Sequence, residues 1–594
     1  MPEYKSPQNE PGMDKNLLLI FLVMAVVMIG AQFFMRKYAP PPPSPAKTEQ
    51  PVSSGPPSTQ PVSPATLSPA TSAQKASGAK NATPSQHVSI QATSESEIVI
   101  ENDLYKITFT NRGAQVKSWI LKKFNDDQGK PLDLVNSAAA VKYGYPLSLW
   151  TYDEGVRNTL NSVLYVPSST EARLQAPAQI SFDYSDSSVT VHKTFRFDHS
   201  YVVAVETSVF ANDSPVSAYP AWPSGFGDQT TLPSYASGQF EYQVNSNTEH
   251  TPAGKISGGN TLHGTFDWVG ASSAYFGAVF IPDNPNDVAT VTLRNSMAMV
   301  PDASKPNETK SVDVVGVAVG RPGKFSARLF AGPKALEVLQ SVPVPAISDA
   351  DKDLRSVLNF GWWGAIARPL FALPYIGLRW FHGFTQNWGW AIVLQTFIIT
   401  LAMTPLRVYQ MKSALKMQKV QPEMKAIQEK YKKYSMKDPR KQEMNQEIAA
   451  LYKTHKVNPV GGCLPLLAQM PFFIAYYKML SAAIELRQAH WLWIHDLSAS
   501  EPFPFLLPII MVVSMFVSQK MTPQAGMDPA QQKMMTVMMP VMMGIFFFRL
   551  PAGLNLYYAE SNLIMIALQA IMNRTELGRE MRELAAKRAR KRDK

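Results

Sequence analysis

Polar side chains recur inside apolar segments of this chain, at spacings that place them on one face of a helix. Thr396, Thr400 and Thr404 stand at positions i, i+4 and i+8 of a run rich in Phe, Ile, Leu and Met, so a helix there would carry one stripe of hydroxyl groups. Threonines inside membrane helices often bond to their own i−4 carbonyl, which leaves two interpretations open: helix-internal bonding, or a wetted wall that binds a polar chain.

Other apolar segments contribute further amide, phenol and carboxyl groups, which we assign with the threonines to one candidate site: Gln469, Asn555, Tyr557, Tyr558 and Glu560. Polar side chains at membrane depth normally face protein or water rather than lipid. Glu560 is the sharpest case, because an unpaired carboxylate in hydrocarbon is costly and should be neutral, paired or hydrated. These residues together predict a hydrophilic cavity or groove among helices.

Residues for covalent, metal or nucleotide chemistry are not arranged in any recognised spacing. Cys463 is the single cysteine, and no Cys/His cluster has zinc or haem spacing. The sequence lacks GxxxxGK[ST], so it has no phosphate-cradling loop of that type. We therefore expect no catalytic residue, cofactor or metal, and a protein that is not an enzyme.

Basic residues are concentrated in two stretches of this 594-residue chain, whose net charge is +11. Heptad steps of apolar residues on both sides of Tyr434–Pro439 predict an antiparallel helical hairpin with Lys-rich outer faces. The charge of this hairpin either only sets membrane topology or docks an acidic partner such as ribosomal RNA. The basic tail could bind either nucleic acid or anionic phospholipid, and charge alone does not distinguish the two. The candidate contacts are Lys430, Lys432, Lys433, Lys437, Arg440, Lys441, Lys587, Arg588, Arg590, Lys591 and Arg592.

The elements that must position these residues are six apolar segments long enough, or nearly so, to cross a bilayer. The predicted transmembrane helices are residues 16–35, 383–406, 459–484, 502–519, 534–549 and 550–573. Basic loops remain cytoplasmic, which places residues 1–15, the hairpin 407–458, the loop 520–533 and the tail 574–594 inside, and the loop 485–501 outside. The fourth and fifth segments are rich in methionine, which suits either an adaptable apolar surface or lipid-facing filler.

The first two segments enclose a large insert on the outer side. Residues 36–95 are rich in Pro, Ser and Thr and predict a disordered linker. Short stretches of alternating apolar and polar residues over 96–345 predict one β-sandwich domain, with a binding or scaffolding role favoured over a catalytic one. Residues 346–382 form an interfacial region, in which an i+4 apolar stripe predicts an amphipathic helix over Asp351–Leu370.

Several motifs, in order along residues 380–575, resemble the YidC/Oxa/Alb family of bacterial membrane insertases. The stretches that carry the resemblance are Asn458-Pro-Val-Gly-Gly-Cys-Leu-Pro-Leu-Leu-Ala-Gln-Met-Pro471, Glu485-Leu-Arg-Gln-Ala489, Trp493-Ile-His-Asp-Leu-Ser498, Asp528-Pro-Ala-Gln-Gln-Lys533 and Pro551-Ala-Gly-Leu-Asn-Leu-Tyr-Tyr558. The anchor, linker and β-domain are similar to the Gram-negative form, by arrangement more than by motif.

The resemblance implies a multi-span α-helical membrane protein with five helices in the insertase core and a large periplasmic all-β supersandwich domain. It further implies a multi-pass protein of the cell inner membrane, with both termini cytoplasmic, that inserts, folds and helps assemble membrane proteins through a hydrophilic groove. The expected partners are nascent membrane proteins, the SecYEG translocon, SecDF accessory proteins, the ribosome and anionic phospholipid, and a monomer is expected to suffice.

The chain departs from the family pattern at several groove positions. Thr400 stands where the family usually has an arginine, whereas Asn555 and Glu560 replace apolar residues and Arg549 replaces an aromatic one. Thr396 and the Tyr557–Tyr558 pair match family positions that contact substrate. Two other function classes remain open at this point: a secondary transporter or channel, which should show internal repeats, and a membrane-tethered sugar-binding protein.

Overall fold

The computed structural model describes most of the chain beyond its first 88 residues. Described are residues 89–300, 307–345, 352–358, 364–431, 438–457, 483–502, 504–521, 529–548 and 550–576, with short pieces at 433–434, 476–477, 479–480, 578–580 and 583. The predicted first transmembrane helix, nearly all of the linker and most of the predicted third helix lie outside these residues.

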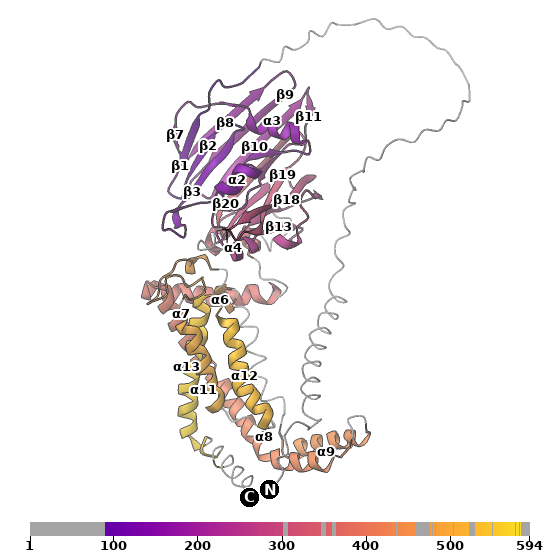
Figure 1. The fold of residues 1–594 in the computed structure, drawn as a ribbon, viewed down its shortest axis with the longest axis vertical. Coiled ribbons are helices and arrows are strands. Elements are labelled where there is room, and N and C mark those ends of the chain that lie inside the picture. Colours follow the sequence, from indigo (N-terminus) through magenta and orange to yellow (C-terminus); the bar gives the residue numbers. More distant parts are fainter. Residues whose placement is uncertain are drawn as a thin grey trace, which may run out of the picture. The chain divides into compact units, whose positions relative to one another are not determined.

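The β-domain consists of three sheets that together hold strands β1 to β20 (Figure 1). The first has the order β4-β3-β2-β1-β7: Pro131–Asp133, Gln115–Asn125, Tyr105–Thr110, Glu97–Glu101 and Arg173–Gln175. The second has the order β14-β13-β16-β17-β20-β10-β9-β8-β6, with β11 beside β10: Asn247–Pro252, Gln239–Val244, Trp268–Ser272, Phe276–Pro282, Lys324–Pro333, Val202–Ala211, Val189–Phe197, Ala178–Ser185, Val166–Pro167 and Ser214–Pro215. The third has the order β15-β18-β19-β12-β5: Thr261–Gly264, Val288–Met299, Lys310–Gly320, Tyr219–Trp222 and Ser148–Trp150.

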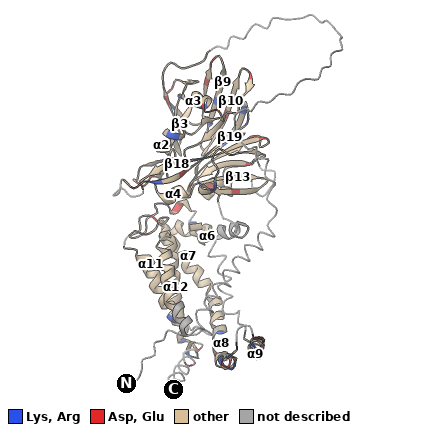
Figure 2. Cartoon of the chain, turned by 45° about the vertical axis from the view of Figure 1, so that its right-hand side comes forward, with Lys and Arg blue, Asp and Glu red and all other residues tan. Residues whose placement is uncertain are grey.

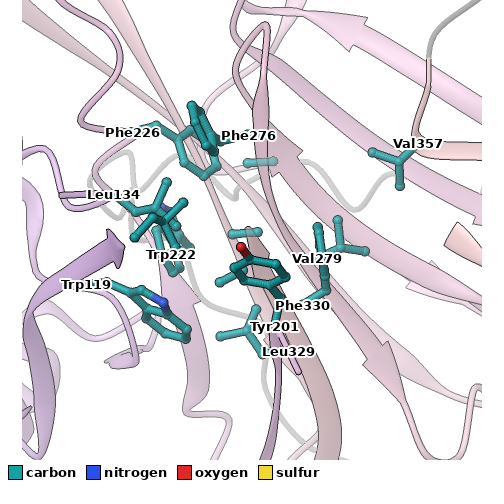
Figure 3. Packing of buried hydrophobic residues seen from close by; sticks show 14 of the residues in the cluster. Trp119, Leu134, Tyr201, Trp222, Phe226, Phe276, Val279, Leu329, Phe330 and Val357 are labelled. Atoms are coloured by element: carbon teal, nitrogen blue, oxygen red, sulfur yellow. The ribbon is translucent and has the colours of Figure 1, made fainter. Parts of the chain in front are cut away.

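The burial of these strands explains the layered packing. Strand β10 alternates between buried and half-buried residues, as expected for a strand with one face on the core. Strands β16 and β17 are buried at every position, so other parts of the domain cover both faces of the sheet at this point. Trp222 packs against Trp119 and Phe226 in the core between layers (Figure 3). The expected β-sandwich is therefore present.

A wholly buried lysine ties two turns of this domain to β9. Lys193 donates hydrogen bonds from Nζ to the carbonyl oxygens of Gly113 (2.7 Å), Ala114 (3.2 Å) and Leu147 (3.0 Å). Its ammonium lies 5.5 Å from the centre of the Tyr165 ring. Burial lowers the pKa of Lys193 to about 7.

The domain also contains short helices, and helices dominate the rest of the described chain. Within or beside the β-domain are α2 (Ser137–Tyr143), α3 (Glu154–Ser162), α4 (Leu232–Ala236), η1 (Ala253–Lys255), α5 (Leu336–Gln340) and η2 (Leu354–Val357). The helical part has α6 (Gly364–Thr385), α7 (Trp388–Ala402), α8 (Thr404–Lys430), α9 (Arg440–Thr454), η5 (Ile484–Leu486), α11 (Leu506–Met521), α12 (Pro529–Phe547) and α13 (Ala552–Arg574). Helix α13 packs against α7 and α11, α11 packs against α12, and α6 packs against α7 (Figure 1).

Length and apolar composition identify one candidate for membrane crossing among the described helices. Among these described helices, none is by itself long and apolar enough to cross a membrane. The pair α7 and α8 meets both conditions together, with a bend of 41° between its members.

The region before α7 differs from the sequence prediction. Instead of one helix over Asp351–Leu370, the structure has the 3₁₀ turn η2 and then the longer α6, which ends at Thr385. The second predicted span, 383–406, accordingly starts too early: α7 begins at Trp388 after Gln386, whose φ is 51°. The Asn387 side chain accepts hydrogen bonds from the backbone N–H groups of Gly389 (3.0 Å) and Trp390 (3.2 Å), and this N-cap sets the boundary.

The predicted basic hairpin corresponds to α8 and α9, which pack against one another. Val420, Met424 and Tyr431 of the predicted apolar seam are buried in α8 and its C-cap. The Tyr452 hydroxyl of α9 donates to the sulfur of Met424 (3.1 Å). Figure 2 shows charged residues on α9, whereas α7 and α11 are nearly free of them.

Candidate functional site

The hydroxyl stripe of α7 and its continuation faces the interior of the helical part. Thr396 is fully buried and Thr400 is 8% exposed. Thr396 Oγ1 donates to the carbonyl oxygen of Ile392 at 2.7 Å, and Thr404 Oγ1 donates to that of Thr400 at 3.2 Å. The interpretation of helix-internal bonding is thus confirmed for Thr396 and Thr404, and their oxygens keep acceptor capacity because a hydroxyl has two lone pairs.

A buried glutamine beside the stripe joins three segments of chain. Gln395 donates from Nε2 to the Pro374 carbonyl oxygen of α6 (2.7 Å) and accepts at Oε1 from the Tyr476 hydroxyl (3.3 Å). Gly377 of α6 makes room for this amide, because a Cβ there would lie 2.8 Å from Nε2. Gln395 therefore holds α6 against α7 and orients Tyr476.

Aromatic rings connect Tyr476 to α13 and then to α12. The ring centre of Tyr476 lies 4.4 Å from that of Tyr557, which lies 5.1 Å from that of Tyr558. Tyr558 meets Phe547 of α12 edge-to-face at 4.8 Å. Tyr557 is buried, whereas Tyr558 is partly buried.

Glu560 lies one helical turn beyond Tyr557 on the same face of α13. The Tyr476 side chain interacts with the Thr396 hydroxyl and, electrostatically, with Glu560. Carboxyl oxygen Oε2 of Glu560 is enclosed and has no hydrogen-bond partner among the described residues. We call Gln395, Thr396, Tyr476 and Glu560 the polar cluster; three elements bring amide, hydroxyl, phenol and carboxyl groups together there.

Asn555, a further predicted site residue, lies elsewhere in the fold. Asn555 is fully buried, and its amide donates to the carbonyl oxygens of Phe547 (3.0 Å) and Leu550 (3.5 Å), so it binds the end of α12 to α13. Gln469 lies outside the described residues. Asn555 thus serves the α12–α13 turn rather than the polar cluster.

The loop over residues 483–500 anchors the ends of the helices around the cluster. Gly389 of α7 lies so close to Trp491 that a Cβ would come 2.1 Å from the indole ring. The buried Glu501 accepts hydrogen bonds from Trp493 Nε1 (2.7 Å) and from the backbone N–H groups of Leu506 (3.0 Å) and Leu507 (2.8 Å). Its carboxylate satisfies N–H groups at the start of α11 that have no partner within the helix.

The described basic residues of the hairpin differ in their availability to a partner. Lys430 forms an ion pair with Glu447 (2.7 Å), whose hydrogen bond raises the pKa of Lys430. Arg440 pairs with Asp438 (3.1 Å) and lies 3.9 Å from the centre of the Tyr434 ring.

Lys433 has an exposed side chain. Nothing is described for Lys432, Lys437, Lys587, Arg588, Arg590, Lys591 or Arg592, or for the side chain of Lys441.

A second buried polar group lies at one end of the ten-strand sheet. Lys334 donates to the Ser273 carbonyl oxygen (2.7 Å), and the Ser273 hydroxyl donates to Asp228 (2.7 Å). Burial raises the pKa of Asp228 to about 6 and lowers that of Lys334. His250 bonds the buried Glu241 at 2.7 Å. Within the described chain, no three His, Cys, Asp or Glu side chains form a metal-binding group.

Two members of the polar cluster were not among the predicted site residues. Gln395 directly precedes Thr396, and an amide in an apolar run is itself a signal. Tyr476 is the first of a Tyr–Tyr pair in the third apolar segment, as Tyr557 is in the sixth. Chain position alone gave no reason to join residues 395 and 476, which lie 81 positions apart.

Comparison with known proteins gives two family matches that follow one another along the chain. Residues 97–373 match the YidC periplasmic domain, and residues 380–579 match the family described as 60Kd inner membrane protein. The membrane protein insertase YidC of Syntrophus aciditrophicus (strain SB) is 32% identical over 574 residues, which are 95% of this chain and 100% of that protein.

Among solved structures, an active YidC insertase with its first transmembrane domain resolved covers 82% of this chain and 95% of its own, at 20% identity and a TM-score of 0.33. A putative aldose 1-epimerase from Escherichia coli K12 covers 40% of this chain and 99% of its own, at 8% identity and a TM-score of 0.25. The two consecutive family matches and the full-length relative at 32% identity show that this chain belongs to the YidC family of membrane protein insertases.

Proposed function

We propose that this chain inserts newly made inner-membrane proteins by receiving the polar end of an entering segment at the polar cluster. Membership of an insertase family, which is not a family of enzymes, supports this function over the transporter and sugar-binding alternatives. The observation that carries the proposal is the meeting of Gln395, Thr396, Tyr476 and Glu560 among otherwise apolar helices.

The energetics of insertion explain why such a cluster is useful. Moving a polar tail through hydrocarbon without hydrogen-bond partners costs several kcal/mol. Burying the apolar part of the segment returns about 25 cal/mol per Å². A site that supplies partners for the tail lowers the barrier, and apolar burial then completes the transfer without a nucleotide.

The proposed topology has six spans in the inner membrane, with both termini and the α8–α9 hairpin in the cytoplasm and the β-domain in the periplasm. The bent pair α7 and α8 supports the second span, because together these helices are long and apolar enough to cross a membrane. Helix α8 then continues into the hairpin. The span count and the domain limits are tested by labelling single cysteines from each side in a Cys463→Ser background.

A photocrosslinker at position 400 tests the path of the substrate directly. Ribosomes stalled on a short two-span membrane protein should yield a nascent-chain adduct there, because Thr400 lies one turn from Thr396 on the same face. Bulky substitutions at Thr396 and Tyr558 should weaken the adduct. Adducts that arise only from the methionine-rich α11 and α12 would move the path there.

The ribosome, anionic phospholipid, SecYEG and SecDF are proposed partners. Lys433 is the sharpest test of the hairpin, because both lysines are exposed but Lys430 is held in an ion pair with Glu447. Lys433→Gln should weaken ribosome binding and reduce the salt slope by about one, with Lys430→Gln as the matched control of smaller effect. Equal effects would contradict the expectation that the ion pair makes Lys430 less available to a partner. Lost binding to anionic vesicles alone would identify lipid as the partner.

A further inference from the structure

Glu560 differs in kind from the other members of the polar cluster. Helix α7 has no acidic or basic side chain, and Glu560 is the single one in α13 before Arg574. It follows the start of α13 by eight residues, which is about 12 Å along the helix at 1.5 Å per residue. The carboxyl group therefore lies well inside the helical part rather than at its end.

The neighbours of Glu560 direct their hydrogen-bond donors elsewhere. The Thr396 hydroxyl donates to the Ile392 carbonyl oxygen, and the Tyr476 hydroxyl donates to Gln395. The Gln395 amide donates to Pro374. Oxygen Oε2 of Glu560 is enclosed without a hydrogen-bond partner among the described residues. An enclosed acceptor of this kind favours a ligand that brings a donor.

We propose that Glu560 makes the site selective for entering tails that carry hydrogen-bond donors and positive charge, such as Lys or Arg side chains, over tails that carry Asp or Glu. This inference rests on the proposed insertion function and adds a specificity-determining residue to it. The discrimination comes from hydrogen bonding: Lys or Arg brings N–H donors that satisfy the carboxyl oxygen, whereas the carboxylates of Asp and Glu bring only acceptors and leave it without a partner.

The test uses three reporters with a single span and a short N-terminal tail that differ only in two tail residues, which are Lys, Gln or Asp. Insertion is measured in liposomes that contain the purified full-length chain and have no membrane potential, since a potential acts on tail charge by itself. Each variant's Lys and Asp values are divided by its own Gln value, so a general loss of activity cancels. In the wild-type chain, the Lys reporter is expected to insert about tenfold more than the Asp reporter.

Glu560→Gln keeps the shape but replaces the carboxyl group with an amide that cannot ionise, and should bring the ratio close to one. Glu560→Asp keeps the carboxyl group and should keep most of the preference. Glu576→Gln is the matched control, because Glu576 is exposed just beyond the end of α13, and it should leave the ratio unchanged.

An unchanged ratio in Glu560→Gln would overturn the proposal, as would equal ratios in Glu560→Asp and Glu560→Gln. If Glu560→Gln inserts none of the reporters, the yield of crosslinks from stalled tails at position 400 provides the same ratio and decides in the same way. Failure of the wild-type chain to insert the Gln reporter would instead refute the proposed function, so the two failures are distinguishable.

Discussion

A single methyl group at Gly377 should break the hydrogen bond that joins α6 to α7. The Cβ of alanine at this position would lie 2.8 Å from Nε2 of Gln395, closer than carbon and nitrogen approach without a shift. That nitrogen donates to the Pro374 carbonyl oxygen at 2.7 Å. Because the amide is the end of a flexible side chain, it can move away, and Gly377→Ala should therefore break the bond rather than unfold the helix.

The expected cost follows from what the amide leaves behind. A buried polar group that loses its partner costs about 1–3 kcal/mol, and measured hydrogen bonds between membrane helices average about 0.6 kcal/mol. Alanine itself favours a helix by about 1 kcal/mol over glycine, which would hide part of this loss. Gly383→Ala is the matched control, because Gly383 lies in the same α6 and a Cβ there meets nothing within 4 Å. Gly377→Ala should be less stable than this control by about 1–2 kcal/mol.

The assay is reversible unfolding of the full-length chain in lipid–detergent micelles, with Gln395→Leu as the second arm of a double-mutant cycle. Gln395→Leu removes the amide, so Gly377→Ala should cost little more in that background, and a coupling of about 1 kcal/mol is expected. Equal stability of the two alanine variants would refute the geometry. A full penalty for Gly377→Ala in the Gln395→Leu background would assign the loss to backbone packing instead.

Three further outcomes are expected. Lys193→Met should destabilise the β-domain by about 2–4 kcal/mol near pH 7, because three backbone carbonyl oxygens lose their donor. Since the folded-state pKa of about 7 lies below the ordinary 10.5, wild-type stability should rise between these pH values, and unfolding of the full chain should show a smaller rise in the variant. Glu501→Gln should lower the free energy of unfolding by about 1–2 kcal/mol. Amide hydrogen exchange at the first turn of α11 should become faster, and unaltered exchange would exclude the capping role. Gly389→Ala should expel the Trp491 ring and cost about 1–3 kcal/mol, seen as a red shift of tryptophan emission, and an unshifted spectrum would contradict the close contact.

Sequence patterns identified elements whose stabilising contacts are local. The heptad steps predicted the α8–α9 hairpin and a turn at Tyr434–Pro439, and the helices end at Lys430 and begin at Arg440. Alternation along β10 likewise matches its burial. In both cases neighbours three, four or two positions apart determine which face is apolar, so the periodicity is visible without the fold.

The prediction was wrong where a boundary depends on one turn of backbone. The apolar stripe over Asp351–Leu370 suggested a helix there, but α6 begins at Gly364 and continues to Thr385. Asn387 before Trp388 is an N-cap signal that the apolar run concealed, because hydropathy does not distinguish the end of one helix from the start of the next.

Composition, charge and periodicity by themselves indicated the apolar helices that the structure describes, the basic hairpin, the β-domain and the presence of polar groups among apolar ones. Only the tertiary structure decided which of these groups meet: Gln395 joins Pro374 and Tyr476, Asn555 bonds to the end of α12, and Glu560 interacts electrostatically with Tyr476. The physical reason is that these contacts join residues on different segments. Their geometry depends on how helices pack, on gaps such as Gly377, and not on any spacing along the chain.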